Sequence, residues 1–252
     1  MARNKPDREY VAPVQKIRLR YAKRGPLKFS SHRDFQRAFE RAVRRVGVPM
    51  AYSAGFNPHP KISYANAAAT GHASEAEYVE IGLAARVEPQ ALLDALLTTM
   101  PRGLDVLEAI EASTPDFVER LEASVWQVGL PGIDATTLVD AVSAFNSRET
   151  VEVSRMTKNG LRTFDARGPV IDAQVMGSEM TESGLICAIL RLVVRHVTPS
   201  VRPDDVLAAI SQVADLAFEI APRVTRLAQG PLTAEGNQVS DPLDLDRNVI
   251  KG

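Results

Sequence analysis

The sequence predicts an α+β fold in which helices pack on one face of antiparallel sheets. Strand-like alternation and helical apolar stripes follow one another in the order β-α-β-β-α-β over residues 14–115. The same order recurs over residues 122–229. Two successive units of this order are typical of two tandem ferredoxin-like domains. We expect a flexible basic arm at residues 1–13 and a disordered tail at residues 230–252, because both segments are polar and show no apolar period.

Residues 15–22 alternate between apolar and polar side chains, which is the pattern of a strand buried on one face only. The apolar face carries Ile17, Leu19 and Tyr21. The opposite face carries Lys16, Arg18 and Arg20. We therefore expect the first strand to present a row of cations on the open face of its sheet.

A helix follows, with Ser31 as its N-cap and Asp34 as the acid of a capping box. One apolar stripe runs along it at helical spacing: Phe35, Ala38, Phe39, Ala42, Val43 and Val46. Gly47 then ends the helix. Arginines recur every four residues beside the stripe, with one more next to them: Arg33, Arg37, Arg41, Arg45 and Arg44. These five form what we call the arginine ridge, on a surface where a solvated helix normally mixes acids with bases.

The remaining elements are assigned from the same two periodicities. In the first unit they are strands at residues 61–65, 77–83 and 103–111 and a helix at residues 89–100. In the second unit they are strands at residues 124–130, 150–156, 161–166, 185–197 and 222–227 and helices at residues 134–146 and 202–218. A Lys-Asn-Gly turn joins the second and third of these strands into a hairpin.

The composition is that of a globular protein, with 45% hydrophobic and 24% charged residues in a chain of 252. No apolar run approaches the roughly 18 residues that a membrane helix needs. The N-terminus also lacks the apolar core of a secretory signal, so we expect a cytoplasmic location and no membrane partner. A single cysteine, Cys187, excludes a disulfide framework, a cysteine-based zinc site and a self-contained iron–sulfur cluster. We expect no metal and no other cofactor.

Charge is distributed unevenly along the chain. Residues 1–65 hold 15 Lys and Arg against 4 Asp and Glu, whereas residues 66–150 hold 4 against 14. A basic block this dense usually faces a polyanion, and the alternative is a solvated face neutralised by the acidic middle of the same fold. We expect the cations of the first strand, the arginine ridge and Lys61 to bind RNA.

Polar side chains that suit a binding pocket are gathered between residues 31 and 61: Ser31, His32, Tyr52, Ser53, Asn57 and His59. In a ferredoxin-like unit the start of the first helix neighbours the second strand, so we expect them to line one cleft. Two of them, His32 and His59, suit general acid–base cleavage of RNA. No phosphate-binding glycine loop, nucleophile elbow or helical pair of metal-binding histidines occurs in the sequence, so familiar enzyme classes are not indicated.

Three blocks resemble a known family: LKFSSHRDFQRAFERAVRR from residue 27, AYSAGFNPHPKISYA from residue 51 and SEAEYVEI from residue 74. They are similar to the radical-SAM-linked proteins, a bacterial family of unknown function found fused behind a radical SAM enzyme or as a separate chain, sometimes encoded beside ribonuclease E or G. The resemblance is strong over residues 17–83 and implies no established reaction. This chain lacks the Cys-x-x-x-Cys-x-x-Cys triad of a radical SAM cluster, so any radical chemistry would belong to a partner.

From these observations we expect an RNA-binding accessory protein of RNA processing or modification that is not itself a catalyst. One alternative is a protein-binding adaptor for a radical SAM enzyme or for ribonuclease E or G. A second alternative is a metal-independent endoribonuclease that uses His32 and His59. The first strand presents cations where an RNA-recognition module would present stacking aromatics, which favours contact with phosphates over readout of bases.

Overall fold

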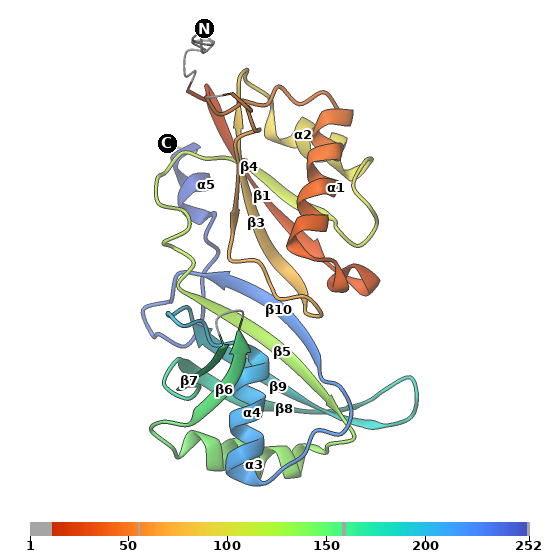
Figure 1. Ribbon diagram of the computed structural model, residues 1–252, viewed down its shortest axis with the longest axis vertical. Coiled ribbons are helices and arrows are strands. Elements are labelled where there is room, and N and C mark those ends of the chain that lie inside the picture. The colour runs from red at the N-terminus through yellow and green to blue at the C-terminus, as the bar shows by residue number, and fades with distance from the viewer. Residues whose placement is uncertain (1–11, 55, 158–159, 251–252) are drawn as a thin grey trace, which may run out of the picture. The chain divides into compact units, whose positions relative to one another are not determined.

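The chain divides into two compact units. The first comprises Met1–Val118 together with Leu243–Gly252, and the second comprises Glu119–Pro242. The computed structural model describes residues 12–54, 56–157 and 160–250 (Figure 1). Most of the predicted basic arm, residues 1–11, lies outside the described residues.

The first unit is an antiparallel sheet with helices packed against it (Figure 1). Its elements are β1 (Gln15–Lys23), the 3-10 turn η1 (Gly25–Phe29), α1 (His32–Arg45), β2 (Ile62–Ala65), β3 (Ala73–Leu83), α2 (Pro89–Leu97), β4 (Val106–Glu111) and α5 (Asp244–Ile250). Neighbouring strands pair antiparallel in the order β4-β1-β3-β2. Strands β1 and β2, which precede and follow α1 in the chain, therefore both pair with β3, which lies between them.

The core of the first unit joins α1 and α2 to one face of this sheet. The predicted stripe of α1 is buried from Phe35 to Val43 and packs against the apolar face of β1. The rings of Tyr21 and Phe35 stack with their centroids 4.0 Å apart. Leu92 and Leu96 of α2 belong to the same cluster, so both helices lie on one side. The predicted apolar faces of the first strand and of the first helix are confirmed. The opposite face of the strand is not open as predicted, because Arg18 is buried there.

The C-terminal segment corrects the prediction of a disordered tail. Helix α5 belongs to the first unit although it is separated from β1 by more than 200 residues of chain. Leu243, just before the helix, and Asp246 within it are fully buried. Sequence periodicity could not reveal this helix, because its seven residues are too few to show an apolar face and its main anchor is a buried carboxylate.

The second unit has the same kind of sheet with an additional hairpin. Its elements are β5 (Ala123–Pro131), α3 (Ala135–Asn146), β6 (Glu152–Thr157), β7 (Gly160–Asp165), β8 (Val170–Met180), β9 (Ile186–Arg195), α4 (Pro203–Ala214) and β10 (Arg223–Gly230). The main strands are antiparallel in the order β10-β5-β9-β8. Strands β6 and β7 form a separate two-stranded sheet.

Two elements of the second unit differ from the sequence prediction. Strand β8 is missing from it, because register shifts beside Ile171 and before Gly177 interrupt the alternation of side chains. The last helix was predicted to reach residue 218 but ends at Ala214, because Asp215 adopts a left-handed backbone conformation with φ of 50°. The predicted class, a mixed α+β fold with antiparallel sheets, is confirmed in both units.

Candidate nucleic-acid interface

Arg18 lies inside the first unit and not on an open sheet face. Its side chain is only 3% exposed. Its Nε donates to Glu80 Oε2 at 2.9 Å, and its Nη1 donates to Asp246 Oδ2 at 2.5 Å. Its Nη2 donates to the carbonyl oxygen of Thr114 at 2.5 Å, and its guanidinium carbon lies 4.7 Å from the ring centroid of Phe117. The guanidinium is fully engaged within the protein and cannot contact RNA.

The other two cations of β1 also have acidic neighbours. Lys16 Nζ lies 2.8 Å from Glu80 Oε1, and Arg20 Nε lies 3.9 Å from Glu108 Oε2. Helix α5 contributes to this side of the sheet through Arg247, which donates to Glu108 as well. The predicted open cationic face is therefore corrected to a face largely neutralised by carboxylates, because α5 and the strand partners of β1 supply acids that no local pattern reveals.

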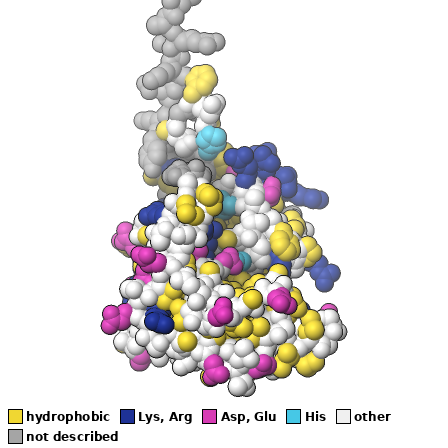
Figure 2. Space-filling model, turned by 60° about the horizontal axis from the view of Figure 1, so that its bottom comes forward, with side chains coloured by type: hydrophobic (Ala, Val, Ile, Leu, Met, Phe, Trp, Pro, Cys, Tyr) yellow, Lys and Arg dark blue, Asp and Glu magenta, His cyan; other side chains and the backbone are white. Residues whose placement is uncertain are grey.

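The arginine ridge has a different environment. All five of its side chains are exposed, and within the described part of the chain none of them forms a hydrogen bond or an ion pair. Helix α1 carries two acids against these five arginines: Asp34 is held in the helix cap and lies near Arg37 and Arg33, and Glu40 lies near Tyr64. Figure 2 shows Lys and Arg side chains gathered on the side on which Figure 1 places α1.

The N-terminus of α1 is organised by the predicted capping box. The Ser31 hydroxyl oxygen accepts a hydrogen bond from the backbone N–H of Asp34, and the Asp34 carboxylate accepts from the backbone N–H of Ser31 at 3.2 Å. The Ser31 hydroxyl also donates to Asp34 Oδ2 at 2.7 Å. Hydrogen bonds from the Ser31 side chain and backbone, followed by the charges of Arg37 and Arg33, hold the pKa of Asp34 below its ordinary value. Ser31 is a helix cap, which leaves its lone pairs little freedom for a ligand.

His32 is exposed at the first turn of α1 and packs against β2. Its ring meets that of Tyr64 edge to face, with the centroids 4.9 Å apart, and its Nε2 lies 3.0 Å from Gln36 Nε2. The Tyr64 hydroxyl is buried and has no hydrogen-bond partner. Burial, followed by the nearby charge of Glu40, raises the pKa of Tyr64, so the phenol stays protonated at neutral pH.

The chain before β2 forms a hairpin from residues 51–54 and the motif residues 56–61, with a bridge between Tyr52 and Pro60. We call it the aromatic hairpin and define it as residues 51–54 and 56–61. Backbone bonds join its arms: Ser53 N–H donates to the His59 carbonyl at 2.9 Å, and Lys61 N–H donates to the Ala51 carbonyl at 2.8 Å. The His59 N–H donates to the Ser53 hydroxyl oxygen at 3.0 Å, so that hydroxyl supports the loop. Tyr52, Asn57 and His59 are exposed.

The two candidate histidines lie in different elements of the first unit. His32, in the first turn of α1, contacts Tyr64 of β2, whereas His59 lies in the aromatic hairpin that precedes β2. Within the described residues the two histidines make no contact. The start of α1 thus holds Ser31 and His32, and the hairpin before β2 holds Ser53 and His59.

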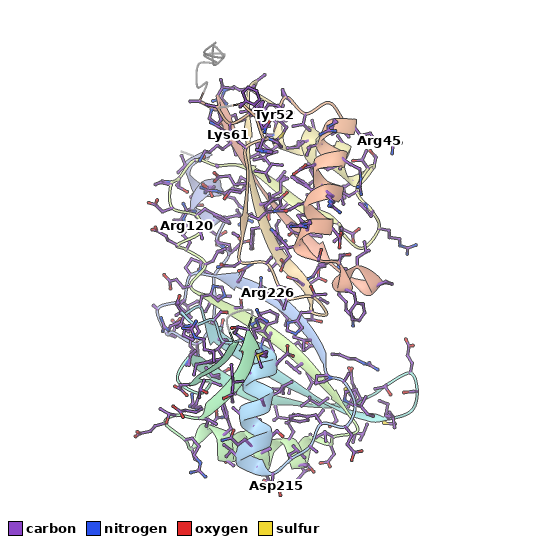
Figure 3. The ribbon with its side chains drawn as sticks, viewed as in Figure 1. Arg45, Tyr52, Lys61, Arg120, Asp215 and Arg226 are labelled. Carbon is purple, nitrogen blue, oxygen red and sulfur yellow. The ribbon has the colours of Figure 1, made fainter. Side chains whose placement is uncertain are left out.

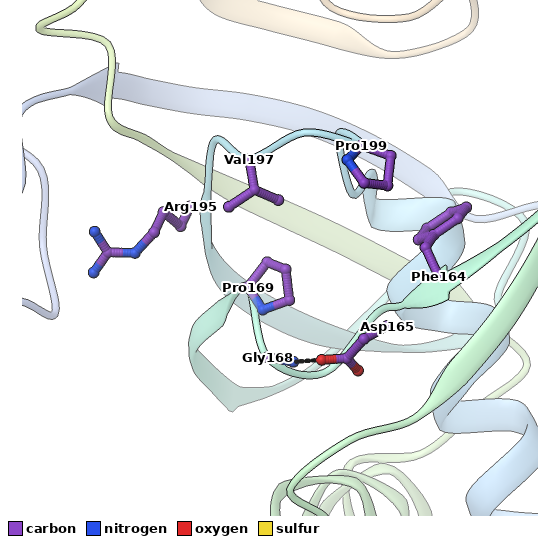
Figure 4. Close-up of a pocket in the computed structure, with 7 residues that line it drawn as sticks. All are labelled: Phe164, Asp165, Gly168, Pro169, Arg195, Val197 and Pro199. Carbon is purple, nitrogen blue, oxygen red and sulfur yellow. Dashed lines mark hydrogen bonds between the residues drawn. The ribbon is translucent and has the colours of Figure 1, made fainter.

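Each unit has a shallow pocket on its surface. One in the first unit, of about 360 Å³, lies between Lys16, Lys61 and Glu80, where the carboxylate already pairs with Lys16. The other, of about 330 Å³, lies in the second unit (Figure 4). Its Asp165 accepts a hydrogen bond from the N–H of Gly168, and the Arg195 guanidinium points away from it. Neither pocket presents a free charged group for a ligand.

A buried polar pair in the second unit escaped the sequence analysis. The Ser124 hydroxyl lies 2.7 Å from His196 Nε2, and His196 Nδ1 lies 2.6 Å from the Leu121 carbonyl oxygen. Burial is the main cause that lowers the pKa of His196 below its ordinary value, so the ring is neutral. Ser124 is 1% exposed, so it cannot meet a substrate. Their 72-residue separation leaves no local signal for the pair.

The described residues contain no group of three or more His, Cys, Asp and Glu side chains arranged to hold a metal ion. Cys187 is buried, and its burial raises the pKa of the thiol. Among the described residues, no helix is both long enough and apolar enough to cross a bilayer.

Residues 16–203 match a family of uncharacterized proteins conserved in bacteria, DUF2344. The chain belongs to this family. The DUF2344 match includes α1 and the aromatic hairpin but ends before α5, which supplies Asp246 to Arg18. No curated protein matches the chain.

Proposed function

We propose that this DUF2344 protein binds RNA through the arginine ridge of α1 and acts as an accessory in RNA processing or modification. One observation carries this proposal: the ridge arginines lack internal partners among the described residues, whereas the cations of β1 face carboxylates. RNA phosphates are the complementary ligand, because a planar guanidinium donates to phosphate oxygens in a bidentate manner.

Repulsion between the arginines destabilises helix α1, and a bound polyanion would remove this repulsion. Arg33, Arg37, Arg41 and Arg45 form successive i,i+4 pairs of like charge. Each such pair destabilises an isolated helix by roughly 0.2–0.5 kcal/mol, so the row costs about 1 kcal/mol. The helix dipole favours cations at the C-terminus but opposes Arg33 at the N-terminus. Asp34 and Glu40 are the two acids of this helix against five arginines, so they relieve only part of the repulsion.

The architecture supports contact through a helix and not through the sheet. We propose that both units are ferredoxin-like modules, supported by the strand orders β4-β1-β3-β2 and β10-β5-β9-β8 and by a βαββαβ sequence of elements, with β6 and β7 inserted in the second. RNA-recognition modules of this type stack bases on the open sheet face. In the first unit Arg18, Asp246 and Phe117 occupy that face.

An enzyme partner would supply the chemistry. The resemblance to radical-SAM-linked proteins indicates a radical SAM enzyme or ribonuclease E or G for this role. The endoribonuclease alternative requires two histidines at one phosphodiester, and here His32 lies in α1 while His59 lies in the aromatic hairpin. In the adaptor alternative the protein binds a radical SAM enzyme or ribonuclease E or G but does not bind RNA. A measurement of RNA affinity therefore distinguishes it from our proposal.

The test compares two triple variants with the same loss of charge. Replacing Arg37, Arg41 and Arg44 by Ala removes three ridge arginines. The control replaces Arg102, Arg148 and Arg162, which are exposed, scattered and without side-chain partners among the described residues. Affinity for a labelled RNA is measured by fluorescence anisotropy over a series of salt concentrations.

For single-stranded RNA, the ridge variant should weaken binding and reduce the slope of log K against log salt by about 0.7 per lost phosphate contact, or about 2 in all. The control should retain most of the affinity and of the slope. Equal effects of both variants would mean that only net charge matters. An absence of RNA affinity in the parent at low salt would leave the adaptor as the better reading.

A further inference from the structure

The aromatic hairpin exposes two aromatic rings on an ordered support. Phe56 is 82% exposed and Tyr52 is 51% exposed. Burial of an aromatic ring stabilises a fold, and most of the Phe56 ring and about half of the Tyr52 ring are not used in this way. The bonds between Ser53 and His59 and between Ala51 and Lys61 hold the arms beneath the rings, and Pro58 and Pro60 restrict the backbone. The rings are therefore presented outward by a built structure.

The hairpin follows directly from the C-terminal end of the arginine ridge. Ala51 follows Arg45 by six positions in the chain, which limits the distance between their Cα atoms to about 20 Å. The turn between them is compact, because Val48 N–H donates to the Val43 carbonyl at 3.0 Å and Met50 N–H donates to the Val48 carbonyl at 2.8 Å. Figure 3 shows Arg45, Tyr52 and Lys61 at the same end of the first unit.

We infer that the aromatic hairpin binds single-stranded RNA by stacking unpaired bases on Tyr52 and Phe56, while the arginine ridge holds the phosphates of the same strand. Every base has an apolar π-face, and stacking on an exposed aromatic ring is the common means by which proteins bind unpaired nucleotides without reading their sequence. The exposed Asn57 and His59 side chains add hydrogen-bonding groups beside the rings.

This inference rests on the proposed function and narrows it to a class of RNA. In a duplex the bases are already stacked on one another and their faces are closed, so two protruding rings gain nothing from it. A surface of arginines alone would favour a duplex, because a duplex has the higher density of phosphate charge. The exposed rings therefore predict that the protein binds single-stranded RNA more tightly than a duplex. The arginine ridge alone does not predict this preference.

The experiment uses the whole chain with a labelled 12-nucleotide RNA, either single-stranded or annealed to its complement. The variants are Phe56→Ala, Tyr52→Ala and Phe56→Leu, the last of which keeps an apolar side chain without a π-face. The control is Phe29→Ala, because Phe29 is also an exposed aromatic, 64% accessible, but lies in η1 before the start of α1. Circular dichroism checks that each variant is folded.

Phe56→Ala and Tyr52→Ala should each weaken binding of the single strand by about 10-fold, and Phe56→Leu should not restore it. The salt slope should stay unchanged, because removing a ring releases no counterion. Phe29→Ala should bind as the parent does. A 2-aminopurine base placed in the strand should change its fluorescence on binding to the parent, and the change should be reduced in Phe56→Ala.

The outcomes separate this inference from the proposed function. If the ridge variant loses affinity while the ring variants keep it, or if the parent binds the duplex more tightly than the strand, stacking is refuted and RNA binding by the ridge stands. If the parent binds neither RNA, both fail. If Phe56→Leu binds as the parent does, the contact is apolar and not a stacked base, and the inference is also overturned.

Discussion

Removal of the Asp246 carboxylate should destabilise the first unit strongly, although it lies near the C-terminus. Its Oδ1 accepts from the backbone N–H groups of Ser113 and Thr114, both at 3.0 Å, and from the Thr114 hydroxyl at 2.6 Å. Its Oδ2 accepts from Arg18 at 2.5 Å. Asp246→Ala would leave two buried N–H donors, a hydroxyl and part of a guanidinium without this acceptor.

Breaking a buried ion pair by removing one partner typically costs about 3–5 kcal/mol, because the remaining charge stays buried and uncompensated. Glu80 remains beside Arg18 and limits the loss, so we expect the lower end of this range. For a protein of this size, roughly 2–4 °C of melting temperature corresponds to each kcal/mol. Asp246→Ala should therefore lower the melting temperature by about 6–12 °C. Asp246→Asn keeps an acceptor for the backbone donors and should cost less.

The pH dependence of stability has a definite sign. Burial alone would raise the pKa of Asp246, but the hydrogen bonds from Thr114 and Arg18 and the charge of Arg18 outweigh it and hold the pKa below the ordinary value. A carboxyl with a lowered folded pKa stabilises the fold above its unfolded pKa of about 3.9. This contribution is lost as the pH falls below that value toward the folded pKa. Asp246→Asn should lack this part of the acid dependence.

The assay is thermal and urea denaturation followed by circular dichroism, with Asp244→Asn as the matched control. Asp244 lies on the same helix with a side chain that is 57% exposed, so its loss should change the melting temperature little. Limited proteolysis should cut residues 243–250 faster in Asp246→Ala. If Asp246→Ala melts with the parent, or if both variants lose equal stability, the buried carboxylate is not the anchor of α5.

Two further experiments test the cap of α1 and the burial of the cysteine. Ser31→Ala removes the helix cap and should cost about 0.5–2 kcal/mol in urea denaturation, whereas Ser31→Thr should retain most of the stability; equal losses would contradict the role of the hydroxyl as the cap. Cys187 should react slowly with a thiol reagent at pH 8 in the folded protein and rapidly in urea, because burial raises the pKa of its thiol and shields it; rapid labelling of the folded protein would contradict this.

Local periodicity predicted those elements whose burial repeats along the chain. The apolar face of β1 and the apolar stripe of α1 are each contained within a few residues or turns, and both are confirmed. Strand β8 was missed for the corresponding reason: its alternation breaks at Gly177, which has a φ of 114° and a shift in register before it. A pattern with a period of two cannot persist through such a shift.

Only part of the candidate site was predicted from the sequence, because the composition of a segment does not show which distant residues pack against it. The same alternation that placed Arg18 opposite the apolar face of β1 predicted an exposed cation, and the structure pairs it with acids 62 and 228 residues away. Phe56 was part of a recognised motif, yet only the fold shows that its ring is exposed and not part of the core. Exposure depends on what packs above a residue, and that is a tertiary property.

The sequence by itself determined the α+β class, the apolar faces of β1 and α1, the capping box at Ser31 and the dense block of basic residues, because each of these follows from neighbours within about one helical turn or from composition. Only the tertiary structure decided which cations remain available. It covers Arg18 with Asp246 and leaves the arginine ridge without internal partners among the described residues. The physical reason is that the charge of a side chain is encoded locally, whereas its neutralisation depends on segments brought together across the whole chain.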